Sequence, residues 1–298
     1  MAFKKLKIFL EMIKFEHCIF ALPFAYLGFV LAAYREKVTV TKTGDSHLFL
    51  IFLWVTLAMV SLRTAAMALN RLVDEPIDAE NPRTQTRALP AGLLTRQFTW
   101  LAALASIGIF IFAASRLNPL CFALTPIPIF LIWIYPYLKR WTWLSHWVLG
   151  LVLGLAPYGG WLAVRPEWSW IPGILTVAVT SWVGGFDVFY SLQDAEFDKM
   201  KGLKSLPARF GTSRAVFIAK SSQGLTVLAF VALGLLFPLG LFYWIGVGAA
   251  SCLIVREHKL VSDFGLSKIN EAFFNMNAWV SVIIFFATLL DLVVARRV

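Results

Sequence analysis

Acidic residues are scarce in this sequence: only 17 of its 298 residues are Asp or Glu, against 27 Lys and Arg. Charged residues make up 15% of the chain and hydrophobic residues 59%, whereas an average soluble domain is about 25% charged and about 45–50% apolar. This composition excludes a disordered chain and a single soluble domain. The net charge of +10 indicates nucleic acid or a membrane surface, and the mean hydropathy of +0.74 favours the membrane.

Cysteine is rare as well. Cys18, Cys121 and Cys252 stand far apart in apolar stretches, which excludes a zinc site or a disulfide framework of the usual spacing. The N-terminal lysines followed by an apolar run resemble a secretory signal. However, the basic part is too long, no small-residue cleavage site follows, and many further apolar runs come later. We therefore expect this segment to belong to the folded protein.

Long apolar runs dominate the chain. A helix that crosses a bilayer needs about 20 mostly apolar residues, and nine segments qualify. They leave too little chain for a sizeable extramembrane domain, so we expect an all-α membrane protein with a single domain over 1–298. Residues 3–15, with apolar side chains on one face, are typical of a short interfacial helix. The expected spans are 17–34, 47–69, 98–115, 118–137, 143–164, 170–190, 215–236, 238–255 and 273–295.

Lys and Arg between the spans predict the orientation. If the N-terminus is cytoplasmic, the inner segments hold 18 of these cations and the outer segments hold 7. Because cytoplasmic loops have the excess of cations, we expect the N-terminus inside and the C-terminus outside, in a cell inner or plasma membrane. The two longest inner loops, 70–97 and 191–214, then face the cytoplasm.

These two inner loops repeat a pattern. Each has two aspartates four residues apart, then cations, then a Leu-Pro-Ala triplet, and each follows the end of a span on the same side. The repetition argues against ordinary solvated loops and suggests two four-helix repeats, about 17–137 and 143–255, with a ninth helix at 273–295. The two motifs are Asn70, Asp74 and Asp78, and Tyr190, Asp194 and Asp198.

The spacing of the motifs predicts a metal site. Residues four apart share one helical face, where like charges repel each other unless a cation offsets them. Mg²⁺ binds one or two carboxylates together with water and phosphate oxygens, so two facing clusters would hold two Mg²⁺ ions on a diphosphate. Nearby cations would neutralise the remaining phosphate charge. The candidate metal ligands are Asn70, Asp74, Asp78, Asp194 and Asp198; the candidate diphosphate-binding cations in the loops are Arg83, Arg87, Lys199, Lys201, Lys204 and Arg209.

Two further charges lie inside expected spans. Arg63 precedes Asn70 by seven residues, and Asp187 precedes Asp194 by seven, so each shares a helical stripe with a motif. A charge at the bilayer centre costs about 2.5 kcal/mol or more, which makes both residues site candidates. Structural pairing with an opposite charge is the alternative for Arg63.

The paired motifs resemble the two aspartate-rich motifs of the UbiA superfamily of intramembrane prenyltransferases, over nearly the whole chain. Residues 135–142, Tyr-Pro-Tyr-Leu-Lys-Arg-Trp-Thr, are similar to the Tyr-Pro-x-x-Lys-Arg-x-Thr segment of the 4-hydroxybenzoate polyprenyltransferase branch. One position departs from the pattern, because Arg71 stands where many members have Asp. That difference removes one acidic contact from the first motif.

The resemblance implies a Mg²⁺-dependent enzyme that transfers a polyprenyl group from an isoprenyl diphosphate to an aromatic carboxylic acid, in quinone biosynthesis. By the same resemblance, Arg140 binds the carboxylate of the acceptor and Lys139 binds the diphosphate or that carboxylate. As a carboxylate within a span and near the expected allylic cation, Asp187 is expected to stabilise that cation or to take up the ring proton. The catalytic candidates are Asp187, Arg63 and Tyr190, and the residues for the acceptor are Arg140 and Tyr135.

Two alternatives stay open. Residues 14–17 and 68–71 are similar to a branch associated with the futalosine route to menaquinone, whose acceptor is a dihydroxynaphthoate. A transporter would couple intramembrane acids to ions near the bilayer midplane, whereas these acids cluster at span ends, which favours diphosphate binding. For either enzyme the expected partners are an isoprenyl diphosphate, an aromatic acid and the lipid bilayer, and not nucleic acid.

Overall fold

A computed structural model describes residues 2–15, 18–35, 45–264 and 276–295, and this part of the chain contains helices and no strand. The expected all-α class is confirmed. The helices are α1 (Ala2–Met12), α2 (Cys18–Arg35), α3 (Asp45–Glu80), α4 (Arg96–Leu117), α5 (Pro119–Ala123), α6 (Pro126–Trp141), α7 (Ser145–Val164), α8 (Trp170–Ser191), η2 (Leu192–Asp194), α9 (Ala195–Met200), α10 (Leu206–Phe210), α11 (Thr212–Leu236), α12 (Leu241–Phe264) and α14 (Asn277–Ala295).

Seven helical segments of the described chain are long and apolar enough to cross a bilayer, which confirms an integral membrane protein. They correspond to seven of the nine expected spans. The apolar part of α2, Leu22–Arg35, is shorter than a full span. Helix α12 has Arg256, Glu257 and His258 in its second half, which lowers its hydropathy.

Three boundaries differ from the expectation. Helix α3 continues through Pro76 to Glu80, so the first motif lies on a helix rather than in a loop. The expected span 118–137 is divided into α5 and α6, because Pro126 and Pro128 have no N–H to donate to the preceding turn. The expected continuous stripe from Asp187 to Asp198 is also interrupted, since α8 gives way to the 3₁₀ turn η2 before α9 begins.

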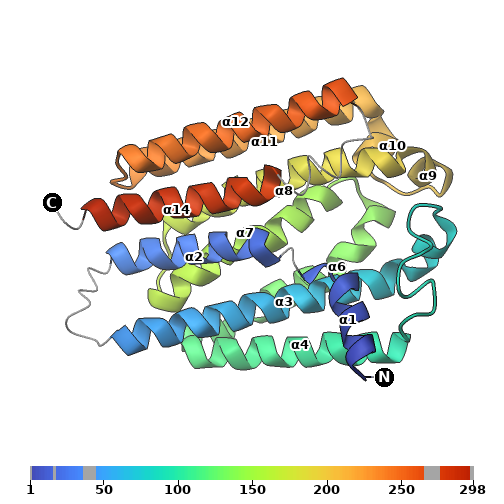
Figure 1. The fold of residues 1–298 in the computed structure, drawn as a ribbon, viewed down its shortest axis with the longest axis horizontal. Helices are drawn as coiled ribbons and strands as arrows, with labels where there is room; N and C mark the ends of the chain where they lie inside the picture. The colour runs from blue at the N-terminus through green and yellow to red at the C-terminus, as the bar shows by residue number, and fades with distance from the viewer. Residues whose placement is uncertain (1, 16–17, 36–44, 265–275, 296–298) are drawn as a thin grey trace.

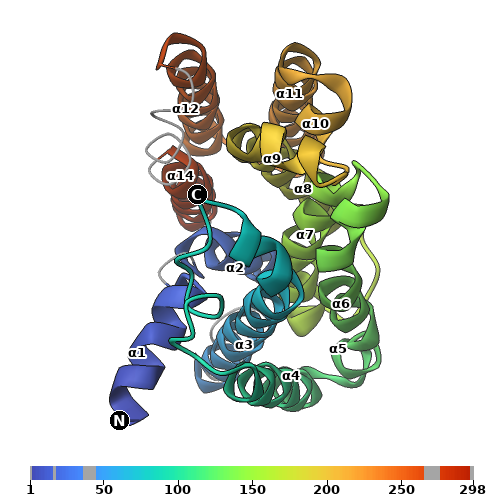
Figure 2. The ribbon, with the colours of Figure 1, turned by 90° about the vertical axis from the view of Figure 1, so that its right-hand side faces the viewer.

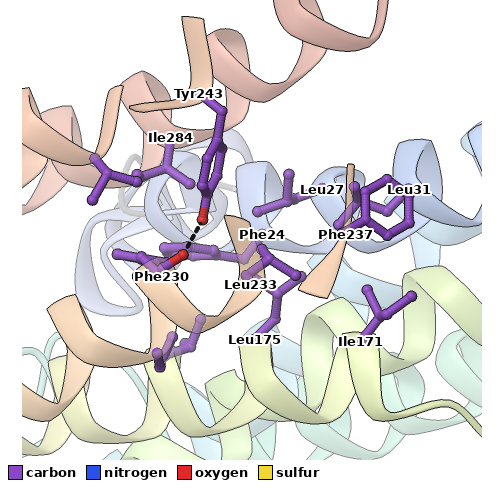
Figure 3. Packing of buried hydrophobic residues seen from close by; sticks show 14 of the residues in the cluster. Phe24, Leu27, Leu31, Ile171, Leu175, Phe230, Leu233, Phe237, Tyr243 and Ile284 are labelled. Carbon is purple, nitrogen blue, oxygen red and sulfur yellow. Dashed lines mark hydrogen bonds between the residues drawn. The ribbon is translucent and has the colours of Figure 1, made fainter. Parts of the chain in front are cut away.

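The long helices run roughly parallel to one another (Figure 1) and surround a central region when viewed along their axes (Figure 2). Helix α7 lies beside both α2 and α8, and α14 lies between α2 and α12. The largest core cluster joins α2, α7, α8, α11, α12 and α14. There the Tyr243 hydroxyl donates a hydrogen bond of 2.6 Å to the Phe230 carbonyl oxygen, with Phe24 and Leu233 nearby (Figure 3).

Helix α1 crosses the bundle beside α3 and α4 (Figures 1 and 2). Its apolar face is only partly buried: Phe9 and Ile13 pack into a core cluster with α3, whereas Leu6 is exposed. The ring of Phe9 meets that of Phe98 edge-on, with centroids 5.7 Å apart. The predicted short amphipathic helix therefore exists and forms one wall of the structure.

The polar elements gather at one end of the bundle. The segment after α3, together with α9 and α10, lies at the right-hand end in Figure 1, whereas α14 runs to the left-hand end. Both aspartate motifs belong to the right-hand end, because Asp78 is near the end of α3 and Asp194 closes η2. The fold thus brings the two motifs to the same end of the protein.

Candidate active site

A cavity of about 710 Å³ opens where both motifs lie, between α1, α3, α6, α7, α8 and α9. The site residues predicted from the sequence line this cavity, except Arg140, Lys199, Lys201, Lys204 and Arg209. Its polar lining residues among the predicted ones are Arg63, Asn70, Asp74, Asp78, Arg83, Arg87, Tyr135, Lys139, Asp187, Tyr190, Asp194 and Asp198.

The other part of the cavity wall is apolar. Met59 and Leu62 on α3, Leu149 and Leu153 on α7, and Trp182 on α8 belong to it. Met59 precedes Asp74 by 15 residues on one helix, which corresponds to about 22 Å at 1.5 Å per residue. The cavity therefore joins a charged region to an apolar region along α3, as an amphipathic ligand requires.

Asp74 is a buried carboxylate of the first motif. Its Oδ2 lies 2.7 Å from Lys139 Nζ and accepts a hydrogen bond of 3.2 Å from Asn70 Nδ2. Its other oxygen, Oδ1, is buried without a hydrogen-bond partner among the described residues. An unsatisfied buried acceptor costs about 1–3 kcal/mol, so this oxygen favours binding of a ligand that can engage it.

Asp78, one turn further along α3, is held by a single cation. Arg87 NH1 donates to both carboxylate oxygens, at 2.7 and 2.8 Å. The Thr84 hydroxyl donates a hydrogen bond of 3.2 Å to the Asp78 carbonyl oxygen. The chain after α3 therefore folds back onto the helix end and places Arg87 in the cavity.

The second motif contacts the segment that follows the first motif. Asp194 accepts hydrogen bonds from Asn81 Nδ2 at 3.0 Å and from Arg83 Nε at 2.8 Å, and it also forms an ion pair with Arg83 NH2. Arg83 NH1 reaches the Tyr190 hydroxyl at 3.1 Å. Burial alone would lower the pKa of Arg83, but the hydrogen bonds and charge of Asp194 raise that pKa above its usual value. Arg83 is therefore permanently charged.

These contacts offset the repulsion between aspartates that lie four residues apart. The sequence suggested that a divalent cation offsets it, whereas here three aspartates are each offset by a Lys or Arg of the chain itself. Among the described residues, no three His, Cys, Asp or Glu side chains stand close enough to form a ready-made metal site. The donor types still suit Mg²⁺, because carboxylate and amide oxygens converge from α3, η2 and α9.

Asp187, on α8, has a partner that the sequence analysis missed. His146 Nδ1 lies 2.7 Å from Asp187 Oδ2, and the backbone N–H of Leu206 donates to His146 Nε2 at 3.3 Å. His146 is 4% exposed and also lines the cavity. A histidine near the start of an expected span was a detectable signal, because ionisable residues in membrane helices are rare and functional.

Arg63 is placed on the cavity wall, as its helical stripe predicted. Its NH1 donates to the Ile13 carbonyl oxygen at 3.5 Å, and Arg71 Nε donates to the Met12 carbonyl oxygen at the same distance. Both arginines therefore connect α3 to α1. Arg71, the residue that departs from the family pattern, binds backbone rather than a motif aspartate. Glu16 and His17 lie outside the described residues.

Five predicted residues lie elsewhere. Arg140 and Lys201 line a neighbouring pocket of about 390 Å³, and Lys201 forms an ion pair with Glu80. Arg140 NH2 donates 3.0 Å to the Val73 carbonyl oxygen, while its buried NH1 has no hydrogen-bond partner among the described residues. Lys199, Lys204 and Arg209 are exposed and line neither cavity.

Comparison with known proteins agrees with this arrangement. The chain is 33% identical over 237 residues to the 4-hydroxybenzoate octaprenyltransferase of Vibrio vulnificus. The aligned region covers 79% of this chain and 81% of the relative. The apo structure of a UbiA homolog from Aeropyrum pernix K1 superposes with a TM-score of 0.82 at 32% identity, covering 93% of this chain and 98% of the homolog.

A more distant structure shares the fold. A UbiA homolog from Archaeoglobus fulgidus, bound to GPP and Mg²⁺, has a TM-score of 0.63 at 18% identity, covering 93% of this chain and 99% of the homolog. The model of the UbiA prenyltransferase family itself matches residues 21–280, most of the chain. The protein, with its paired aspartate motifs at one end of a membrane bundle, therefore belongs to the UbiA prenyltransferase family.

Proposed function

We propose that this prenyltransferase transfers a polyprenyl group from an isoprenyl diphosphate to 4-hydroxybenzoate, in quinone biosynthesis. The observation that supports this most is the single cavity in which both aspartate motifs adjoin an apolar wall. A diphosphate suits the charged region and an isoprenoid tail suits the apolar one. The names of relatives such as the Vibrio vulnificus enzyme point to the same acceptor.

Mg²⁺ fits the charged region. When bound, it would neutralise the negative charge of the leaving diphosphate. The buried, unpartnered Oδ1 of Asp74 is one oxygen ready for it. The relative from Archaeoglobus fulgidus was solved with Mg²⁺. We propose two ions, held by Asn70, Asp74, Asp78, Asp194 and Asp198.

The cations of the site then divide into two groups. Lys139, Arg83 and Arg87 line the cavity and would bind the phosphate oxygens directly. The outer cations would attract the diphosphate to this end of the protein. These outer residues are Lys199, Lys201 and Arg209.

The acceptor is assigned to the residues beside the second motif. Tyr135 and Tyr190 offer aromatic and hydroxyl contacts inside the cavity, and Asp187 faces the same space. Arg140 lines the neighbouring pocket rather than this cavity, and we propose its unpartnered NH1 as the donor for the carboxylate of an acceptor that reaches from one pocket to the other. Arg63, between α1 and α3, closes the cavity wall around the reacting atoms.

The architecture that supports this function is a single domain of nine spans, with two four-helix repeats and a ninth helix. The motif helices α3 and α8 each pack along a following helix, α4 and α11 respectively, which supports the repeat. The excess of Lys and Arg near the motifs supports a cytoplasmic N-terminus and active site. The accessibility of a C-terminal tag in sealed right-side-out vesicles tests this orientation.

The test of the proposed reaction is product identity. Membranes that contain the protein are incubated with geranyl diphosphate and Mg²⁺, together with 4-hydroxybenzoate or a dihydroxynaphthoate, and the products are identified by mass spectrometry. We expect prenylated 4-hydroxybenzoate. Product from the dihydroxynaphthoate alone would move the enzyme to menaquinone biosynthesis, and no product with any aromatic acid would overturn aromatic prenyl transfer.

A further inference from the structure

His146 stands at the first turn of α7 and connects two separate parts of the second half of the chain. Its Nδ1 lies 2.7 Å from Asp187 Oδ2 on α8. On the opposite side of the ring, the backbone N–H of Leu206, at the start of α10, points at Nε2 from 3.3 Å. The ring is almost completely buried, so water does not replace either contact.

These two contacts determine which nitrogen has the proton. A backbone N–H is only a donor, so Nε2 must accept and cannot itself carry hydrogen. The proton of the neutral ring is therefore on Nδ1, which donates it to Asp187. In a doubly protonated ring, Nε2 would also have a hydrogen, and that N–H would point at the N–H of Leu206. His146 thus acts as a neutral donor to the Asp187 carboxylate.

Asp187 differs from three other aspartates of the cavity. Asp74, Asp78 and Asp194 each form an ion pair with Lys or Arg, so a cation already occupies each of these carboxylates. Asp187 has a neutral partner at Oδ2, and its Oδ1 makes no hydrogen bond or ion pair within the described chain. Its side chain is 23% exposed and lines the cavity.

From this geometry we propose that His146 is the positioning residue for Asp187 in proton removal; the proposal rests on the prenyl transfer proposed above. A C–C bond forms between the ring and the allylic carbon, and the C–O bond to diphosphate breaks. The ring carbon then loses its hydrogen as a proton to Asp187 Oδ1, and its C–H electron pair restores the aromatic ring. His146 holds Oδ2, so that Oδ1 faces the ring.

Two substitutions of His146 separate the contact made by Nδ1 from the contact made by Nε2. In His146→Asn, the short amide can place N–H near the position of Nδ1 and retain the donor to Asp187. In His146→Gln, the longer amide reaches the position of Nε2 and retains the contact with Leu206, but it loses that donor. Purified protein is assayed for kcat and for KM of both substrates, and its thermal midpoint checks folding. The acceptor is 4-hydroxybenzoate, used with hydrogen or deuterium at the prenylated carbon.

We expect His146→Gln to lower kcat about 10- to 100-fold, as the loss of partners that orient active-site groups commonly does. KM for the diphosphate stays unchanged, and the deuterium isotope effect on kcat rises because proton removal becomes slower. His146→Asn retains most of the activity. Equal losses in both variants with an unchanged isotope effect, or wild-type kcat in His146→Gln, would overturn the role of His146. An inactive wild-type protein would overturn the proposed function, and this role with it.

Discussion

Lys139, Arg87 and Arg83 are the immediate partners of the motif aspartates, and this pairing defines the site at the scale of single residues. The pairs of Asp74 and Asp78 are largely enclosed, since both aspartates are only 5% exposed, whereas the Arg83–Asp194 pair is more exposed. A buried carboxylate that lost its cation would be left with an uncompensated charge. We expect a Mg²⁺-bound diphosphate to exchange partners with these pairs, so that the carboxylates meet the metal and the cations meet the phosphate.

Lys139 offers a test of this exchange. Its side chain is charge-paired with Asp74, and charge-assisted hydrogen bonds contribute about 1.5–3 kcal/mol each. Lys139→Met should therefore raise KM for the isoprenyl diphosphate about 10- to 100-fold, with KM for the acceptor unchanged. Steady-state kinetics of the purified protein measures both constants. Arg116→Gln, an exposed cation at the end of α4, is the control for a general charge effect. A raised acceptor KM with an unchanged diphosphate KM would contradict the assignment of Lys139.

The aspartate motifs were predictable because residues four apart on a helix share a face wherever the helix lies. His146 and Asn81 were not predicted, because their roles depend on Asp187 and Asp194, which other segments bring to them. The position of Arg140 beside a separate pocket was missed, although adjacent residues on a helix point in different directions and Lys139 lines the main cavity. Local spacing thus predicts which residues gather, and tertiary packing determines their partners.

At the scale of helices, apolar runs predicted where most helices lie but not where they end. Helix α3 continues for more than ten residues beyond the expected span 47–69, because its polar end still forms helix without being apolar. The break between α5 and α6 depends on prolines, which in membranes are sometimes accommodated within one helix. Hydropathy reports the membrane environment, whereas helix ends depend on backbone hydrogen bonds.

Close contact between α2 and α7 depends on glycine. A Cβ at Gly160 would stand 2.0 Å from the Ala25 carbonyl oxygen, and one at Gly28 would stand 1.9 Å from the Pro157 carbonyl oxygen. Neither backbone atom can move without separating the helices. Small residues that let backbones approach are typical of helix packing in membranes.

Gly159 and Gly160 therefore form a matched pair for a stability test. Gly160→Ala should lower the free energy of unfolding by about 1–3 kcal/mol, the usual effect of overpacking. Gly159→Ala adds a methyl group where nothing lies within 4 Å, so the thermal midpoint should stay unchanged or rise. Thermal unfolding in detergent micelles measures both. Equal midpoints for the two variants would contradict the close approach of α2 and α7.

At the scale of the whole molecule, the two aspartate motifs share one end of the bundle. The motifs, α9 and α10 lie at one end, while α14 runs to the other (Figure 1). The composition predicted a membrane protein, and the repeated motif predicted a shared end, without any knowledge of which helices are neighbours. The arrangement of helices around the cavity could not be predicted, since it depends on close packing such as that of α7 between α2 and α8.

The central claim is that the aspartates of α3 and of the α8–η2–α9 segment form one diphosphate site. Its most direct measurement is prenyl transfer from geranyl diphosphate to 4-hydroxybenzoate by purified protein with Mg²⁺, compared among the wild type, Asp74→Ala and Asp194→Ala. We predict product from the wild type and a loss of at least about 100-fold in each variant, because each removes charge stabilisation of the leaving group. Wild-type turnover in both folded variants would contradict the claim.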